Sequence, residues 1–178
     1  KWDEAGRSLT KTKTYNNNFK DVSSSSWYYS AVVSAYRYGL MDGVETKKFK
    51  PNDQITNAQA ITLAARLRKL YVSGSASFAN TNPWYKAYSD YAISQKIITS
   101  APANMNATLT RQEFASILAK ALPDAALPAV NTVANGAIPD VYRSDTGIYK
   151  LYRAGILAGS DSKGTFRPNA AITRAEVA

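Results

Sequence analysis

Apolar residues recur at helical spacing most clearly between residues 110 and 122. The ones three or four positions apart are Phe114, Ile117, Leu118, Ala121 and Leu122. Such spacing places them on one face of an α-helix. Pro123 cannot continue a helix, and Thr110 followed by Glu113 has the spacing of a capping box, in which the two side chains satisfy amides at the start of a helix. The pattern predicts a helix over 110–122 with Thr110 as its N-cap.

Two other segments carry the same box. Thr56 is followed three positions later by Gln59, and Thr173 by Glu176. We therefore expect Thr56, Thr110 and Thr173 to cap the second helix of three helix-loop-helix units. A single box of this kind is explained equally well by helix capping alone.

The first helix of each unit is predicted from the segment before the loop. In the first unit the apolar residues at helical spacing are Trp27, Ala31, Ala35 and Tyr38. A serine run ending at Ser26 is expected to cap this helix, and Gly39 to end it. Turn positions that favour a positive φ are assigned to Gly39, Gly43, Gly155 and Gly159.

The units are copies of one another. YRYGLMDG (36–43) matches YRAGILAG (152–159), and FKPNDQITNAQA (49–60) matches FRPNAAITRAEV (166–177). A degenerate middle copy begins at Trp84. We assign unit 1 to 19–71, unit 2 to 78–122 and unit 3 to 138–178, after an extension over 1–18. Units this small cannot bury a core alone, so they are expected to pack as one body. The second helix of unit 3 is short, and we expect a continuing chain or another segment to complete it.

Composition removes many kinds of function. The chain has no histidine and no cysteine, which excludes Ser-His-Asp and Cys-His nucleophilic sites, zinc sites and disulfide scaffolds. We predict no cofactor, no metal and no catalysis. No apolar run approaches the roughly 18 residues of a membrane span, so membrane insertion is not expected. A net charge of +9 favours an anionic partner such as nucleic acid, anionic lipid or an acidic glycan.

The ordered motifs resemble the S-layer homology family. The resemblance covers roughly residues 19–178 and rests on FKDV (19–22) and IPDV (138–141), the glycine pairs, the F-[KR]-P-N segments and the threonine boxes. It implies an all-α body of three repeats with pseudo-threefold symmetry and ligand grooves between units. It also implies a module at the bacterial cell surface that binds an acidic, often pyruvylated, secondary cell-wall polysaccharide. Self-association would come from regions outside this segment.

The resemblance also assigns binding residues. The family's ligand-contacting arginine corresponds to Arg111 and Arg174, and its tryptophan to Trp27 and Trp84. The N-terminus of a capped helix offers free amides and a positive dipole, which independently favours an anion beside these arginines. Asn57 replaces the arginine in unit 1 and predicts a weakened site. The Arg111 groove is expected to be the more complete, because Arg174 lies so near the end of the sequence.

Several residues have two interpretations. Trp27 and Trp84 are explained either by core packing or by stacking on a sugar ring. Gly43 and Gly159 are turn residues first and sites of close approach to a ligand second.

Two other functions compete with glycan binding. The positive charge is compatible with a helical nucleic-acid-binding protein, but no helix reads as a basic recognition helix. A glycoside hydrolase would need a carboxylate pair across a cleft. The carboxylates that recur by position are Asp21, Asp140, Glu113 and Glu176, and their recurrence favours capping and turn roles.

Overall fold

The computed structural model describes residues 10–178, and over that range the protein is helical. The α-helices are α1 (Tyr29–Arg37), α2 (Asn57–Ser73), α3 (Lys86–Ser94), α4 (Arg111–Ala121), α5 (Thr146–Arg153) and α6 (Arg174–Val177), with a 3-10 turn at Asp124–Ala126. Extended pairing in the same residues is limited to isolated bridges. The predicted all-α class is confirmed. No helix in this part of the chain has the length and apolar character to cross a membrane.

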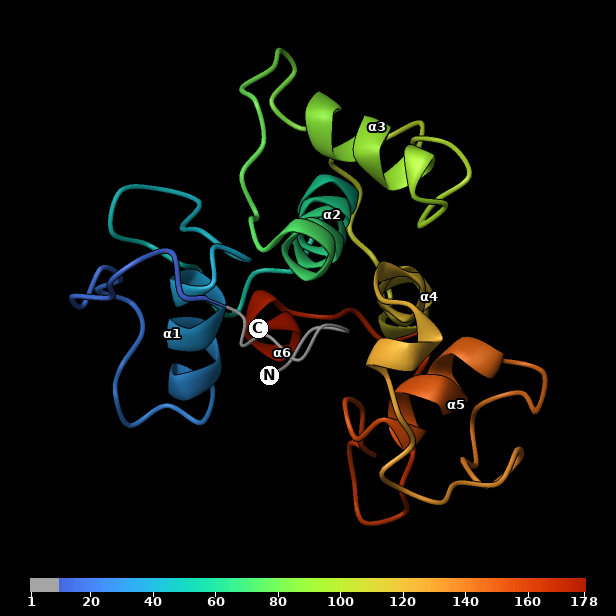
Figure 1. Ribbon diagram of the computed structural model, residues 1–178. Helices are drawn as coiled ribbons and strands as arrows, with labels where there is room; N and C mark the ends of the chain where they lie inside the picture. Colours follow the sequence, from blue (N-terminus) through green and yellow to red (C-terminus); the bar gives the residue numbers. More distant parts are fainter. Residues whose placement is uncertain (1–9) are drawn as a thin grey trace.

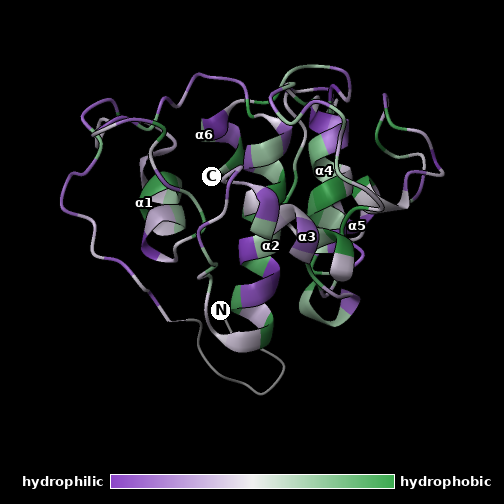
Figure 2. Ribbon diagram, turned by 90° about the horizontal axis from the view of Figure 1, so that it is seen from above, coloured by the Kyte–Doolittle hydropathy of each residue, from purple (hydrophilic) through white to green (hydrophobic). Residues whose placement is uncertain are grey.

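The helices form an inner and an outer set. Figure 1 shows α2, α4 and α6 near the middle, with α1, α3 and α5 outside them. Helix α2 packs against both α3 and α4, and α4 packs against α5. In the view from above, hydrophobic and hydrophilic residues alternate along α2, and the loops beside α1 are mostly hydrophilic (Figure 2).

All three inner helices begin with the predicted capping box. Thr56, Thr110 and Thr173 each accept a hydrogen bond from the N3 amide, and the N3 side chain accepts one from the threonine amide. Helix α4 ends at Ala121, before Pro123. The box residues interact over four positions of sequence, which is why local spacing was enough to predict these helix starts.

The predicted start and cap of the first helix were wrong. Helix α1 begins at Tyr29 without a side-chain cap, and it buries Val32, Val33 and Ala35. Trp27 lies outside the helix and is 74% exposed. Long-range packing selects the buried face here, and residue spacing alone does not reveal it.

Two recurring aspartates hold the loops that precede the inner helices. The Asp21 carboxylate accepts hydrogen bonds from the amides of Phe49 and Lys50. Asp140 does the same for Phe166 and Arg167. The structural role expected for these carboxylates is confirmed.

Backbone hydrogen bonds link the start of each inner helix to the loop of another unit. The amides of Arg174 and Ala175 donate to the carbonyl oxygens of Asp53 and Pro51. The remaining links are Asn57 to Ala107, Ala58 to Met105, Arg111 to Ala170 and Gln112 to Pro168. Unit 3 thus bonds to unit 1, unit 1 to unit 2, and unit 2 to unit 3. Amides that a helix N-terminus usually leaves free are satisfied here.

Residues before the first assigned unit also pack onto it. The amides of Thr12 and Lys13 donate to the carbonyl oxygen of Arg37 at the end of α1. Val130 and Asn131 make the same pair of bonds to Arg153 at the end of α5. The arm over residues 12–15 therefore reaches the loop after α1, close to the cavity described next.

Candidate functional site

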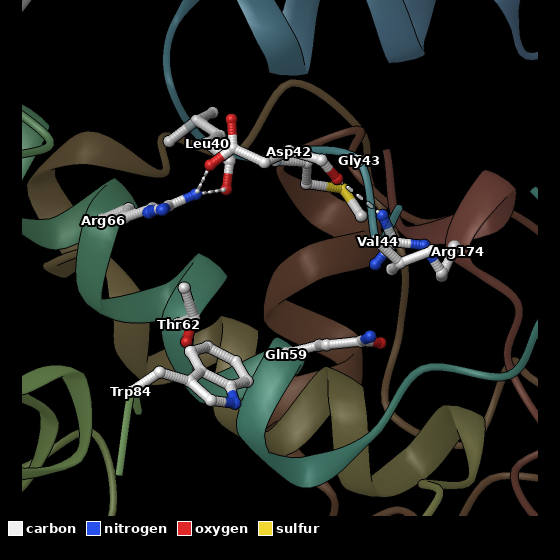
Figure 3. A pocket seen from close by; sticks show the side chains of 10 residues that line it. Leu40, Asp42, Gly43, Val44, Gln59, Thr62, Arg66, Trp84 and Arg174 are labelled. Carbon is white, nitrogen blue, oxygen red and sulfur yellow. Dashed lines mark hydrogen bonds and ion pairs between the residues drawn. The ribbon is translucent and has the colours of Figure 1, made fainter. Parts of the chain in front are cut away.

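A cavity of about 380 Å³ opens where segments of all three assigned units meet. Its lining residues are Leu40, Met41, Asp42, Gly43, Val44, Gln59, Thr62, Arg66, Trp84 and Arg174. Figure 3 shows Asp42 between the two arginines, with Thr62 and Trp84 on the opposite side. Three predicted site residues, Gly43, Trp84 and Arg174, thus lie together.

Arg174 is held from inside the protein. It is only 3% exposed; its Nε donates to the carbonyl oxygen of Phe49 and its Nη2 to that of Asp42, both at 2.8 Å. The guanidinium also lies 4.5 Å from the centre of the Phe49 ring. Burial lowers the pKa of Arg174 to about 10, although Asp53, Asp21 and Asp42 oppose the change. Among residues 10–178, no carboxylate lies within ion-pair distance of this cation.

Arg66 supplies a second cation in the cavity wall. Its Nη1 donates to Asp42 Oδ2 at 2.9 Å, and its Nη2 donates to the Tyr88 hydroxyl at 3.0 Å. Lys13, from the N-terminal arm, forms an ion pair with the other oxygen of the Asp42 carboxylate. Burial raises the pKa of Asp42, but the hydrogen bond from Lys13 and the charge of Arg66 outweigh it and leave the pKa below its ordinary value.

The two glycines assigned to binding have a packing role that the sequence did not reveal. Neither Gly43 nor Gly159 has a positive φ, whereas Gly39 and Gly155 do, at 69° and 70°. A Cβ on Gly43 would lie 2.7 Å from the Lys48 carbonyl oxygen, and one on Gly159 would lie 2.6 Å from Gly164 Cα. The turn prediction is therefore confirmed for the first glycine of each pair. The second glycine is required by close approach of the protein's own backbone.

Trp84 and Trp27 are both on the surface, so core packing was the wrong interpretation for both. Trp84 is 52% exposed and lines the cavity. Trp27 is 74% exposed and does not line it.

Arg111, expected in the more complete groove, does not line the cavity either. Its Nε donates to the carbonyl oxygen of Phe166 at 2.8 Å, and its Nη1 pairs with Glu176 Oε1 at 2.9 Å. Asn57 donates from Nδ2 to the Asn104 carbonyl oxygen at 3.0 Å. The first two amides of α2, α4 and α6, the helices that begin at Asn57, Arg111 and Arg174, all donate to loop carbonyl oxygens. The expectation that these amides are free to bind an anion was therefore wrong.

Sequence reasoning missed Arg66, Asp42 and Lys13. A signal for Arg66 was present, because Gln59, Thr62 and Arg66 are spaced three and four apart. This spacing places three polar residues on one face of α2, whose first half is otherwise mostly apolar and buried. Asp42 and Lys13 carry no comparable pattern.

Comparison with known proteins identifies two segments of the chain, which supply part of the cavity wall. The sequence profile of the S-layer homology domain matches residues 18–61 and 137–178. These two segments belong to the S-layer homology family. Domains of this family are non-catalytic modules that anchor proteins at the cell wall, and membership indicates a cell-surface location.

Relatives of this S-layer homology chain are much longer proteins. The Surface-layer 125 kDa protein of Lysinibacillus sphaericus is 32% identical over 127 residues, covering 65% of this chain and 11% of that protein. Exoglucanase XynX of Acetivibrio thermocellus is 32% identical over 120 residues, covering 61% of this chain and 11% of the enzyme. Amylopullulanase of Thermoanaerobacterium thermosulfurigenes is 29% identical over 120 residues, covering 61% of this chain and 6% of that enzyme. The chain therefore spans about a tenth or less of the length of these relatives.

Proposed function

We propose that this chain anchors a larger protein by binding an acidic, pyruvylated cell-wall polysaccharide in a groove between its units, without catalysing turnover. The observation that carries the proposal is the cavity formed by Arg174, Arg66, Gly43 and Trp84. It combines positive charge, a polar wall and an exposed aromatic ring, a set of groups suited to a sugar that bears a carboxylate.

The charge of Arg174 is the main argument for an acidic ligand. A buried cation is costly unless an anion compensates it. Two main-chain carbonyl oxygens solvate Arg174 but supply only partial charge. The carboxylates of Asp53, Asp21 and Asp42 favour the charged form only from beyond ion-pair distance. A ligand carboxylate near the cavity would provide a direct partner, and arginine suits carboxylates better than lysine does because its donors are arranged in a planar fork.

We also propose that the three units are related by approximate threefold rotation. Support comes from the cyclic order of the backbone hydrogen bonds between helices and loops. The amide of Arg174 donates to the carbonyl oxygen of Asp53, that of Asn57 to Ala107, and that of Arg111 to Ala170. This arrangement explains why residues of three units line one cavity.

The repeated carboxylates support binding without catalysis. Glu113 and Glu176 accept hydrogen bonds in capping boxes, and Asp21 and Asp140 accept backbone amides. A glycosidase needs one carboxyl group free to donate a proton and a second free to act on the sugar. These four carboxylates are instead engaged in supporting the fold.

Calorimetric titration of the purified chain tests the function. The ligands are an acidic cell-wall polymer, the same polymer after chemical removal of its acidic substituent, and duplex DNA. We expect binding to the acidic polymer alone, weakened moderately by salt because one or two charges are involved. Equal affinity for the neutral polymer, preference for DNA, or release of sugar fragments would overturn the proposal.

A further inference from the structure

Arg66 is a part-buried arginine that leaves one of its donors without a hydrogen bond. Its side chain is 16% exposed, and its hydrogen bonds are made by the two terminal nitrogens. The guanidinium also lies 5.2 Å from the centre of the Tyr88 ring. The Nε atom is buried without a hydrogen-bond partner in the described residues. One turn earlier on α2, the buried Thr62 hydroxyl also lacks a partner among those residues. Both side chains line the same cavity.

Unpartnered polar atoms of this kind are rare in folded proteins, because burying them without a hydrogen bond costs free energy. Two of them one turn apart in a cavity wall indicate that the ligand-free arrangement does not use all the binding capacity of this wall. In the ligand-free arrangement a single nitrogen of Arg66, Nη1, donates to a carboxylate. The carboxylate of a sugar could instead accept hydrogen bonds from two nitrogens of the guanidinium.

In the absence of a ligand, Arg66 forms its ion pair with Asp42. Its carboxylate is shared between Arg66 and Lys13, and its carbonyl oxygen accepts from Arg174. Asp42 lies at the rim, with 39% of its side chain exposed. Partly exposed ion pairs contribute little net stability, so an incoming carboxylate can replace Asp42 at low cost. Figure 3 shows the Asp42 carboxylate turned toward Arg66, on the cavity side of the loop.

We propose that Arg66 is a direct contact for the ligand's carboxylate, and that Asp42 is an internal competitor that occupies Arg66 until this carboxylate displaces it. The inference rests on the proposed function and adds a specificity determinant to it. A neutral sugar cannot displace Asp42 from Arg66, because it brings no charge to replace the one removed. Asp42 therefore lowers the affinity for every ligand that needs Arg66, and only an acidic ligand overcomes it.

Opposite effects of two substitutions at one ion pair test the inference. Titration of the acidic polymer should show Arg66→Gln weakening binding about 10-fold or more, and Asp42→Asn strengthening it about 3- to 10-fold. The neutral polymer should bind Asp42→Asn no better than it binds the unmodified chain. Thermal melts establish whether each variant is folded. If Arg66→Gln does not fold, Arg66→Lys replaces it in the titration.

A matched ion pair on α3 controls for net charge. Lys86 and Asp90 pair at 2.6 Å on the surface and do not line the cavity. Lys86→Gln and Asp90→Asn change the total charge as the two test variants do, and we expect less than a twofold effect from either.

Two outcomes separate this inference from the function on which it rests. If Asp42→Asn binds the acidic polymer as weakly as Arg66→Gln, or no differently from Asp90→Asn, then Asp42 is not a competitor and the inference is overturned, while the proposed function stands. If the unmodified chain does not prefer the acidic polymer, both are overturned.

Discussion

Arg111 and Arg174 occupy the same position in matching motifs, but their surroundings differ in charge. Arg111 pairs with Glu176, the capping-box residue of the unit to which its helix is bonded. Under the proposed threefold relation, the residue of unit 1 that corresponds to Glu176 is the neutral capping-box residue Gln59, which lines the same cavity as Arg174. Figure 3 draws Gln59 on the Arg174 side of the cavity.

This difference shows that the charge of each arginine site is determined by a neighbouring unit and not by the motif that supplies the arginine. A glutamine in unit 1 leaves Arg174 without a carboxylate partner in residues 10–178, and a glutamate in unit 3 neutralises Arg111. The neutral capping-box residue of unit 1 thus leaves the cation of Arg174 without an ion-pair partner among the described residues.

The largest expected effect separates the two arginines. Arg174→Met should weaken binding of the acidic polymer about 10- to 100-fold, because it removes the buried cation of the cavity. It should also lower the free energy of unfolding by about 2–4 kcal/mol, because two carbonyl oxygens lose their donor. Arg111→Met should change binding less than threefold and cost about 1–2 kcal/mol. Titration and urea unfolding measure both quantities, and a larger binding loss for Arg111→Met would reverse our ranking of the two sites.

A smaller effect should follow from exchanging the facing residues. Gln59→Glu should weaken acidic-polymer binding about 5- to 10-fold by giving Arg174 an internal partner. Glu176→Gln should leave binding at the Arg174 cavity within twofold. Glutamine and glutamate both complete a capping box, so neither change should move the thermal midpoint by more than a few degrees. Unchanged binding by Gln59→Glu would show that the neutral residue is not what leaves Arg174 available.

The smallest effect should distinguish the tryptophans. Trp84→Ala should weaken binding about 3- to 10-fold through loss of ring stacking, whereas Trp27→Ala should have no measurable effect. Both side chains are largely exposed, so unfolding free energies should change by less than about 1 kcal/mol. Quenching of tryptophan fluorescence by added polymer, lost in Trp84→Ala and retained in Trp27→Ala, provides a direct check.

The sequence predicted those features that depend on nearby residues. The three capping boxes and the end of α4 are local, and the structure has them where spacing placed them. The exposed position of Trp27 was not predictable in this way, because its surroundings depend on how separate segments pack. The resemblance assigned Gly43, Trp84 and Arg174 to binding, but the full composition of the cavity was missed for the same reason. It joins Asp42, Arg66, Trp84 and Arg174 across most of the chain, and no spacing rule relates these residues.

The bonds between Arg174 and the first unit have a consequence for the time course of folding. Arg174 Nε and Phe49 are 125 residues apart in sequence, and Arg174 Nη2 and Asp42 are 132 apart. Closing loops of this length costs chain entropy before any contact compensates it, so such contacts form slowly compared with capping boxes. The binding cavity should therefore become complete only in the last phase of folding, after the individual helices have formed. Refolding followed by ligand-dependent fluorescence would then lag behind refolding followed by far-UV circular dichroism.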